Sequence, residues 1–583
     1  MKKFLAVLLA MAMVVSCLAG CQGGGEESSK TETSKTETSK TETSKAEESS
    51  KTEEEKPYEL LDAIEYTGEM NIARSSYVAY PVESDGYTLR WWVALPNNVA
   101  NGVGTVADTE WAKNMQEYTG VGIEWIESDG SSEAFGVMSV SAELPDVVEW
   151  EWANAYPGGP VAAEADGLLT YLNDLIQPYT NGADLWQFLQ DNPQIDKQVK
   201  DDSGNYYCVP FIRGSKYLQC TSGPIVRADL FEAAGVDYTT ISTVDEMYDA
   251  LTKVKAVEGI EYPMLGRSLG EVINLLGSAY NFRAGMYRDY DTTEIKYGYA
   301  EEGFKEFMKT AVQWKNEGLL HPDSLSIDKN TRTEAMLNGK TAFIYGAGGG
   351  DLGTYVQAVE TDPSKYVSTI KFDTINFLVA NEGDTPHYAG ASYDYATTSK
   401  SHGAITADCE HPELAMAVLN WGFSEEGHLI LNFGSDYTYD ENGDPTYSEK
   451  TMNYAENGFA SIATSMAAGG RANMSFPGAQ DPGYIFAYYA SPVQKQALYN
   501  WNDYQDSQST LIPPVTLTAE EATEYATIIN NLDTQVKTSY GAWFAGTADV
   551  EADWDSYLAT LESMGLSRAI ELQQAAVDRY DAR

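Results

Sequence analysis

Several kinds of residue are scarce in this chain of 583 residues, and each scarcity excludes a class of protein. Only 38 residues are lysine or arginine, against 87 aspartates and glutamates, so the formal net charge is −49. This charge argues against nucleic acids and anionic membrane surfaces as partners and favours a neutral or cationic ligand, although it also suits the solubility of an exported protein. The five cysteines and five histidines form no CxxC pair and no HExxH spacing. We therefore expect no metal site and no cofactor.

Long apolar runs are also rare, and the first of them has the pattern of an export signal. Lys2 and Lys3 precede an apolar stretch from Phe4 to Val15, which is too short to span a membrane as a helix. Leu18-Ala19-Gly20-Cys21 then resembles the lipobox of bacterial lipoproteins. The resemblance implies that residues 1–20 are a signal peptide and that Cys21 carries a lipid anchor at the extracellular face of the cell membrane. The alternative is an ordinary signal peptide that contains two cysteines.

Residues 21–57 contain almost no side chain that could enter a hydrophobic core. Serine, threonine, glutamate and lysine dominate, and Lys-Thr-Glu-Thr-Ser recurs from Lys30. Such a segment cannot bury enough apolar area to offset its ordering entropy, so a disordered tether is predicted. No later segment holds about 18 consecutive apolar residues, the length expected of a second membrane anchor.

The rest of the chain is long enough for two or more hydrophobic cores. Predicted strands at 87–95, 121–126 and 146–150 alternate with predicted helices at 108–118 and 132–142. This alternation is typical of βαβ units and a parallel sheet. Ligands of such sheets bind beyond the carboxyl ends of the strands. The candidates at those ends are Asn97, Trp150, Glu151 and Trp152. From Thr518 the chain is predicted to be helical nearly to its end, with breaks near 541–547 and Gly565.

Six fragments occur in a characteristic order along the chain. They are Leu144-Pro-Asp-Val-Val148, Asp202-Ser-Gly-Asn-Tyr-Tyr-Cys-Val-Pro210, Val226-Arg-Ala-Asp-Leu230, Asn338-Gly-Lys-Thr-Ala-Phe343, Pro412-Glu-Leu-Ala-Met416 and the tail from Trp554 to Tyr580. Together with the lipobox, this order resembles that of the large extracellular solute-binding proteins of bacterial carbohydrate ABC importers.

The resemblance implies an α/β fold of the periplasmic-binding-protein type, in which two lobes close on a ligand in the cleft between them. Carried onto this chain, lobe one takes residues 86–212 and 365–411, and lobe two takes residues 213–364 and 412–583. The chain departs from smaller members of the family through extra material at 425–515 and helical additions at its C-terminus. These additions leave the contents of the cleft open.

The resemblance also suggests which residues bind ligand. A sugar needs flat apolar faces against its ring and planar polar groups for its hydroxyls. Trp150 and Trp152 are expected to stack on the sugar, unless both are buried in lobe one. The resemblance implies that the chain first crosses between lobes at Arg213 and Tyr217 and returns after Tyr393, Asp394 and Tyr395, although these residues could equally pack the hinge. Arg213, Asp394 and Asn97 are expected to bind hydroxyls.

Two motifs allow other functions. Gly266-Arg-Ser-Leu-Gly270 matches the nucleophile elbow of hydrolases, but Ser268 could instead cap a helix that starts near Glu271, with its loop touching ligand. Gly348 to Gly353 matches GxGxxG, which is typical of dinucleotide sites, but could equally be a glycine-rich turn that brings the backbone close to the cleft.

Two further questions stay open at this point. Residues 440–444 resemble part of a calcium loop but carry a hairpin signal at Asn442-Gly443, and Cys208 and Cys220 could form a disulfide.

The interpretation that accounts for most of these patterns is a lipid-anchored, monomeric binding protein. It would capture a neutral oligosaccharide and deliver it to an ABC permease, without catalytic residues. A surface hydrolase of glycans or esters is the main alternative, and a glycan sensor or adhesin without a transport role is another.

Overall fold

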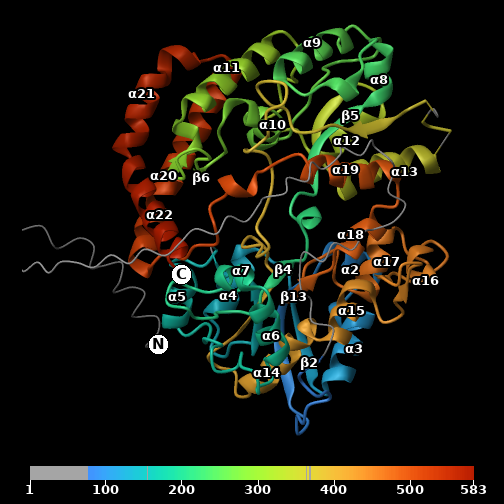
Figure 1. Ribbon diagram of the computed structural model, residues 1–583, viewed down its shortest axis with the longest axis vertical. Helices are drawn as coiled ribbons and strands as arrows, with labels where there is room; N and C mark the ends of the chain where they lie inside the picture. Colours follow the sequence, from blue (N-terminus) through green and yellow to red (C-terminus); the bar gives the residue numbers. More distant parts are fainter. Residues whose placement is uncertain (1–75, 154, 363, 367–368) are drawn as a thin grey trace, which may run out of the picture. The chain divides into compact units, whose positions relative to one another are not determined.

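Two β-sheets, each with its own hydrophobic core, organise the body of the protein (Figure 1). The structure, a computed structural model, describes residues 76–583 except for 154, 363, 367 and 368. The predicted signal peptide, Cys21 and the tether lie outside the described residues. Within the described part of the chain, no helix is both long and apolar enough to span a membrane.

The first sheet has the strand order β10-β3-β1-β2. β1 (Thr88–Ala94) is parallel to β2 (Gly122–Ser128) and β3 (Val147–Trp150), whereas β10 (His402–Ile405) is antiparallel to β3. The parallel sheet predicted from residues 87–150 is therefore confirmed. The helices that pack into its core are α3 (Glu110–Thr119), α4 (Ser132–Ser139), α5 (Gly159–Ala165), α6 (Ala183–Asp191), α7 (Pro193–Gln198), α14 (Pro412–Asn420) and α15 (Glu425–Phe433).

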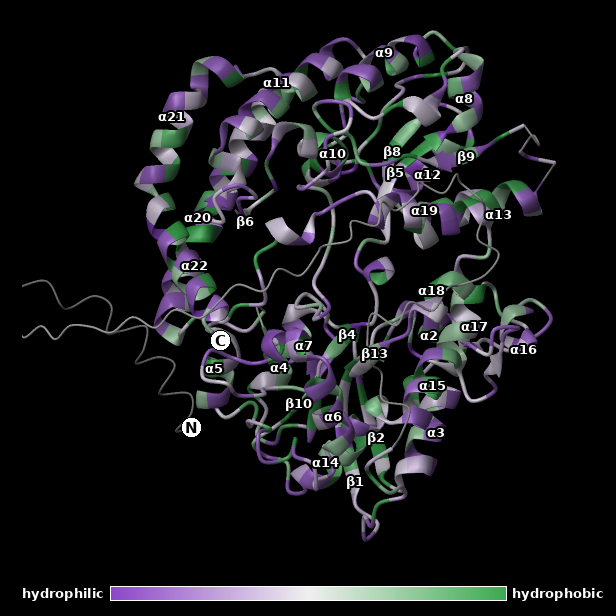
Figure 2. Cartoon of the chain, viewed as in Figure 1, coloured by the Kyte–Doolittle hydropathy of each residue, from purple (hydrophilic) through white to green (hydrophobic). Residues whose placement is uncertain are grey.

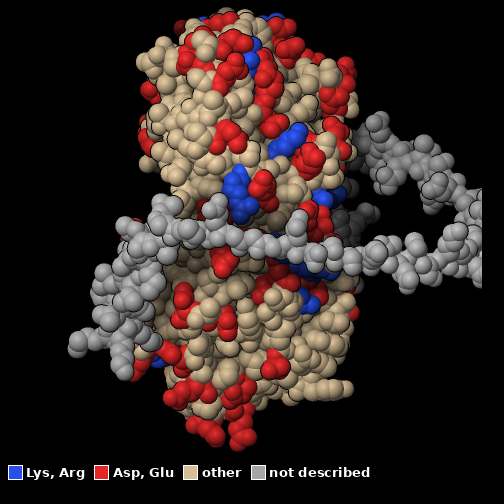
Figure 3. All heavy atoms as spheres, turned by 90° about the vertical axis from the view of Figure 1, so that its left-hand side faces the viewer, with Lys and Arg blue, Asp and Glu red and all other residues tan. Residues whose placement is uncertain are grey.

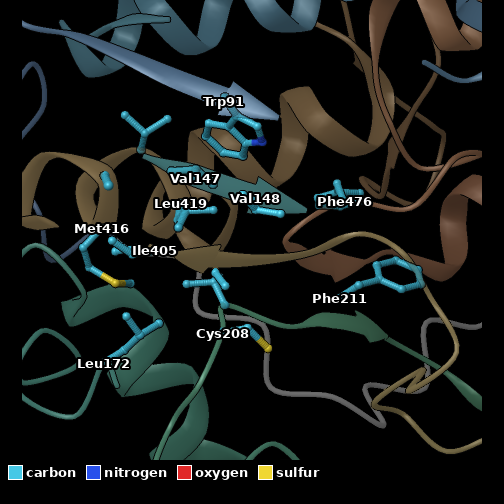
Figure 4. Close-up of a cluster of buried hydrophobic side chains, with 14 of the residues drawn as sticks. Trp91, Val147, Val148, Leu172, Cys208, Phe211, Ile405, Met416, Leu419 and Phe476 are labelled. Carbon is cyan, nitrogen blue, oxygen red and sulfur yellow. The ribbon is translucent and has the colours of Figure 1, made fainter. Parts of the chain in front are cut away.

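Local sequence signals explain where the connecting helices begin. The Thr109 hydroxyl accepts a hydrogen bond from the Ala112 N–H at 3.2 Å and caps α3, and Ser131 caps α4 through the Ala134 N–H at 3.1 Å. The core itself collects side chains from distant parts of the chain, among them Trp91, Ile405 and Phe476 (Figure 4). Figure 2 shows hydrophobic residues concentrated along the strands and hydrophilic residues on the outside of the helices.

The second sheet has the order β8-β5-β9 and is antiparallel throughout. Its strands are β5 (Ser222–Arg227), β8 (Phe343–Ala347) and β9 (Phe372–Thr374). The helices packed on it or into the adjoining core are α8 (Ala228–Ala233), α9 (Val244–Val254), α10 (Leu269–Leu276), α11 (Glu302–Asn316), α12 (Lys329–Leu337), α13 (Thr354–Thr361) and α19 (Pro492–Asn502). A hairpin of β6 (Met286–Arg288) and β7 (Ile295–Tyr297) completes this part.

Three long helices end the chain, as its sequence predicts. α20 (Ala519–Ala545) packs against α11, α21 (Val550–Ser563) and α22 (Leu566–Asp581). Gly546 and Gly565, both in the left-handed region, stand at the two breaks. Trp543 and Trp554 are buried in the second core, so these helices are part of that core rather than an appendage.

The segment 425–515 contributes to the first core and to the core that adjoins the second sheet. Besides α15 and α19 it contains β11 (Thr438–Tyr439), β12 (Pro445–Thr446), α16 (Glu449–Met452), α17 (Ile462–Gly469), β13 (Gly478–Gln480) and α18 (Pro482–Tyr488), and α2 (Asn97–Gly102) packs on α17. The predicted turn at Asn442-Gly443 joins β11 to β12. Asp440 holds this turn, because its carboxylate accepts hydrogen bonds from the N–H groups of Asn442 and Asp444.

The lobe boundaries remain a prediction, but two contacts bear on them. β9 lies inside 365–411, which was assigned to lobe one, yet it pairs with β5 of the second sheet. Conversely, Leu414, Met416 and Leu419 follow residue 411 and are buried in the first core. Strand pairing and core packing thus link segments that the proposed boundaries separate.

Three segments run side by side where the chain crosses between the cores. β4 (Phe211–Arg213) pairs in parallel with β13, and Ile212 forms a bridge with Tyr395. His402 holds this crossing, because its Nδ1 accepts the Phe211 N–H at 3.0 Å and its Nε2 lies 3.0 Å from the Ala396 carbonyl. Burial lowers the pKa of His402 to about 4, so the ring is neutral near pH 7.

A buried ion pair joins the 425–515 segment to the first sheet. Arg471 donates two hydrogen bonds to the Glu149 carboxylate, at 2.9 and 2.8 Å, and Trp91 Nε1 donates a third at 3.1 Å. The Arg471 guanidinium also lies over the Trp111 ring, 4.8 Å from its centroid. Both charged side chains are almost fully buried, so each charge depends on the other for its compensation.

Replacing Arg471 with methionine should strongly destabilise the protein, because the Glu149 carboxylate would stay buried without a counter-charge. We expect a loss of about 3–5 kcal/mol in the free energy of unfolding, measured by urea denaturation followed through tryptophan fluorescence. The double variant Glu149→Gln, Arg471→Met removes both charges and should recover most of that loss. Equal urea midpoints for the Arg471→Met variant and the parent would contradict a stabilising role for the pair.

Candidate functional site

A cavity of about 230 Å³ lies where the crossing strands meet the turn after β8. It is lined by residues of β4, β13, the loop at 472–475, the glycine-rich turn and α18. The lining residues are Phe211, Arg213, Leu218, Thr221, Ala347, Gly349, Gly350, Ala472, Asn473, Ser475, Gln480, Tyr484, Ile485, Tyr488 and Tyr489.

A larger cavity, of about 510 Å³, lies between residues 153–159 and α20. None of the residues predicted to bind ligand lines it, and its walls are mostly apolar. The smaller cavity is therefore the better candidate, since it combines flat rings with polar groups.

Three residues that line the smaller cavity each have a buried polar atom without a hydrogen-bond partner among the residues that the structure describes. These atoms are Arg213 Nε, Asn473 Oδ1 and Gln480 Oε1. The orientation of both amides follows from their other ends: Asn473 Nδ2 donates to the Ala463 carbonyl at 2.9 Å, and Gln480 Nε2 donates to the Ala472 carbonyl. A buried polar atom without a partner is costly, so these groups are suited to a polar ligand.

Backbone contacts hold Arg213 in place. Its N–H donates to the Asp394 carbonyl at 2.8 Å, and its Nη1 donates to the Leu218 carbonyl. Burial lowers the pKa of the guanidinium from its usual high value, but the group still carries its charge at neutral pH. The site therefore offers one fixed cation beside two amide oxygens.

Three tyrosines of α18 and its end supply the flat surfaces. The rings of Tyr484 and Tyr488 are nearly parallel, with centroids 6.0 Å apart and an angle of 10°. Tyr489 follows at 48° to Tyr488 and is 2% exposed. Sequence reasoning missed these residues because it left 425–515 unassigned. The spacing of Tyr484 and Tyr488 places them on one face of a helix, which is the signal that could have found them.

The glycine-rich turn is shaped by its approach to these rings. Residues Gly348–Gly353 form a π-helical turn (η7) directly after β8. A Cβ atom on Gly348 would lie 2.7 Å from the Tyr489 ring, and one on Gly349 would lie 2.7 Å from the Tyr488 ring. The structure thus favours the interpretation of this GxGxxG sequence as a turn that brings backbone close to the cleft.

The carboxylate of Asp351 holds this turn. It accepts a hydrogen bond from the Ala347 N–H at 2.9 Å and forms an ion pair with the buried Arg332 at 2.8 Å. Arg332 also donates to Glu271 at 3.1 Å, which anchors the turn to α10.

Trp150 and Trp152 are buried in the first core, each only 1% exposed. The Trp150 ring stacks on Phe135 at 4.4 Å and carries the Lys400 ammonium 4.9 Å from its centroid. Trp152 donates its N–H to the His402 carbonyl at 3.2 Å. These contacts occupy both indoles in this conformation, so a stacking role for either stays a prediction that requires the packing to open.

The other predicted residues are spread around the crossing, and only Arg213 lines the cavity. Asn97 is exposed at the start of α2, and burial raises the pKa of the half-buried Glu151. Ser268 caps α10, because its hydroxyl accepts the Glu271 N–H at 3.2 Å. The structure thus supports capping by Ser268, the alternative to the nucleophile elbow.

Four of the predicted residues are engaged by neighbouring side chains or backbone. Tyr217 packs edge-on against Phe486 and Tyr499, and the Tyr393 hydroxyl donates to the Leu511 carbonyl at 3.4 Å. Asp394 accepts a hydrogen bond from Gln219 at 2.8 Å, and the hydroxyls of Tyr395 and Tyr207 lie 2.9 Å apart. Their contacts fit hinge packing, and their binding roles stay predictions.

Cys208, Cys220 and Cys409 are free thiols. Among the described residues, no three His, Cys, Asp or Glu side chains gather closely enough to hold a metal ion.

Comparison with known proteins gives a family and a fold. A family model described as bacterial extracellular solute-binding protein matches residues 101–428. None of the curated proteins matches the sequence.

Three similar solved structures each match 85% of this chain. They are the alginate-binding protein AlgQ2 without calcium ion (20% identity, TM-score 0.66, 98% of that chain), an HMO-binding solute-binding protein from Bifidobacterium longum infantis (18%, 0.67, 99%) and FusA of S. pneumoniae in complex with kestose (16%, 0.64, 99%). Together they confirm the predicted periplasmic-binding-protein-like fold.

Adding one methyl group to Gly348 should destabilise the protein, since the new Cβ would overlap the buried Tyr489 ring. We expect Gly348→Ala to lower the free energy of unfolding by about 1–3 kcal/mol in urea denaturation. Gly350→Ala is the matched control, because its Cβ would meet only the Lys329 ammonium at 3.5 Å. If the two variants were equally stable, the close approach of ring and backbone would not constrain the turn.

Proposed function

Since the family match covers more than half of the chain, this protein belongs to the bacterial extracellular solute-binding proteins, and we propose that it captures an oligosaccharide for an ABC permease. The observation that carries this proposal is the cavity at the crossing, whose lining combines the part-exposed ring of Tyr488 with three residues that hold buried polar atoms without partners among the described residues. Flat rings suit the C–H face of a sugar, and the polar atoms suit its hydroxyls.

The proposed mechanism uses the position of this cavity between elements of the two cores. Phe211 belongs to the first core, whereas Gly349 and Gly350 follow β8 of the second sheet. A ligand that contacts residues of both cores binds the closed arrangement more tightly than the open one. This difference in affinity stabilises the closed arrangement. The closed form would present the permease with a surface made from both sides. No covalent step is required, and a monomer suffices.

The similar solved structures support the proposal that the solute is a glycan. They include an alginate-binding protein, an HMO-binding protein and a protein in complex with kestose. The net charge of −49 taken as a whole favours a neutral sugar. Lipid attachment at Cys21 would keep the body at the extracellular face of the membrane, close to the permease.

Binding of an oligosaccharide should stabilise the protein without consuming the sugar. At 100 times its dissociation constant a ligand adds about 2.7 kcal/mol, which a thermal-shift screen detects, and chromatography of the sugar afterwards reports cleavage. Tyr488→Ala should weaken the binding about tenfold through loss of a ring surface, whereas Tyr179→Ala, a 99% exposed site, should not change it. Cleaved sugar would identify an enzyme instead.

Removal of the Cys21 sulfur should release the protein from the membrane. In cell fractionation, Cys21→Ala should move the protein from the membrane fraction to a soluble one, because no lipid can be attached. Cys17→Ala is the control and should leave it in the membrane fraction. Equal behaviour of both variants would favour an ordinary signal peptide over a lipobox.

A further inference from the structure

We infer that the cleft binds a sugar that carries a carboxylate and that the Arg213 guanidinium recognises this group. The inference rests on the proposed function and specifies its ligand. It departs from the expectation of a neutral sugar, which came from the charge of the whole chain.

The lining of the cavity has the opposite charge balance to the rest of the protein. The chain holds 87 acidic residues against 38 lysines and arginines, and acidic side chains are widespread on the face shown in Figure 3. Yet the residues that line the cavity include no aspartate or glutamate, and Arg213 is their one charged member. The absence of acidic residues from the lining of this site, in a chain that is strongly acidic as a whole, indicates a negatively charged ligand, because aspartates or glutamates would repel it.

Arg213 also differs from the fully buried arginines of the protein. Arg227, Arg332 and Arg471 each form an ion pair with a carboxylate, at 2.8 Å. Arg213 differs in that it forms no ion pair with any residue that the structure describes; its Nε, like that of Arg332, has no hydrogen-bond partner among them. A cation removed from water without a counter-ion is costly, and an anionic ligand would compensate it.

Arg283 provides a useful contrast, since it too has no acidic partner among the described residues. Its guanidinium donates to the Thr510 hydroxyl at 2.8 Å and to the carbonyls of Ser507 and Ala389. The Nε of Arg283 therefore has a hydrogen-bond partner, whereas that of Arg213 has none among the described residues. Burial raises the pKa of the Cys220 thiol, and the positive charges of Arg283 and Arg213 both act to lower it. The two guanidinium groups therefore add positive potential to the same region.

The amide oxygens identify the rest of the ligand. Gln480 Oε1 and Asn473 Oδ1 accept hydrogen bonds but cannot donate them, so they suit hydroxyl groups and not a second carboxylate. A carboxylate suits Arg213 because the planar guanidinium matches its two oxygens. A sugar with one carboxylate and several hydroxyls, such as a uronic acid residue, satisfies all three groups.

Isothermal titration of the purified protein can test this with matched pairs of ligands. The probes are trisaccharides of galacturonate, guluronate and glucuronate, each beside its neutral methyl ester, and one sulfated trisaccharide. We expect at least one uronate to bind ten times or more tightly than its ester. Arg213→Met should remove this difference, so that acid and ester bind with similar affinity, and Arg213→Lys should retain part of it. Arg568→Met, the same change in an exposed ion pair far from the cavity in sequence, should have no effect.

Each of the following results would overturn one part of the inference or of the proposed function. Esters that bind as tightly as the acids, or a preference that survives Arg213→Met, would overturn recognition of the carboxylate while leaving the proposed sugar binding intact. A preference for the sulfated sugar would overturn the choice of carboxylate. Absence of binding by every acid, ester and neutral oligosaccharide would overturn the proposed function and this inference with it. The comparison of acid with ester uses the unaltered protein, so it stands even if Arg213→Met does not fold.

Discussion

The ion pair between Glu149 and Arg471 is the constraint on which the candidate site depends. Glu149 lies in β3 at the centre of the first core, and Arg471 immediately precedes the loop that carries Asn473 and Ser475 into the cavity. Because both charges are buried, separating them would leave each without compensation, and two hydrogen bonds fix their geometry. The pair thus fixes a loop of the 425–515 segment against a sheet formed more than three hundred residues earlier.

A second arginine pair holds the opposite side of the cavity. Arg332 binds the Asp351 carboxylate, and Asp351 in turn accepts the backbone N–H at the start of the glycine-rich turn. The turn can then lie against the rings of Tyr488 and Tyr489, which only glycine permits at that distance. Rigid support of this kind is what a binding site needs to hold its polar groups in place before the ligand arrives.

Arg213 differs from Arg332 and Arg471, because it forms no ion pair with any residue that the structure describes. Backbone hydrogen bonds to Leu218 and Asp394 hold Arg213, and its guanidinium lies 6.0 Å from the centroid of the Phe211 ring, so a ligand would neutralise its charge. The chain contains 87 acidic residues, yet none of them lines the cavity beside Arg213. No acidic residue lines the cavity, while the buried Arg332 and Arg471 are paired with carboxylates, so the cleft has an electrostatic character that differs from that of the whole chain.

The sequence by itself determined the features that depend on neighbouring residues. The parallel strands β1 to β3, the caps at Thr109 and Ser268, the turn at Gly443 and the breaks between the last helices all follow from local propensity and periodicity. Only the tertiary structure decided which side chains face the cleft. Trp150 and Trp152 stand at strand ends, yet Phe135 and the His402 carbonyl cover them, whereas Tyr484 and Tyr488 come from a segment with no assigned role. Such outcomes depend on contacts between residues hundreds of positions apart, and no local pattern encodes those contacts.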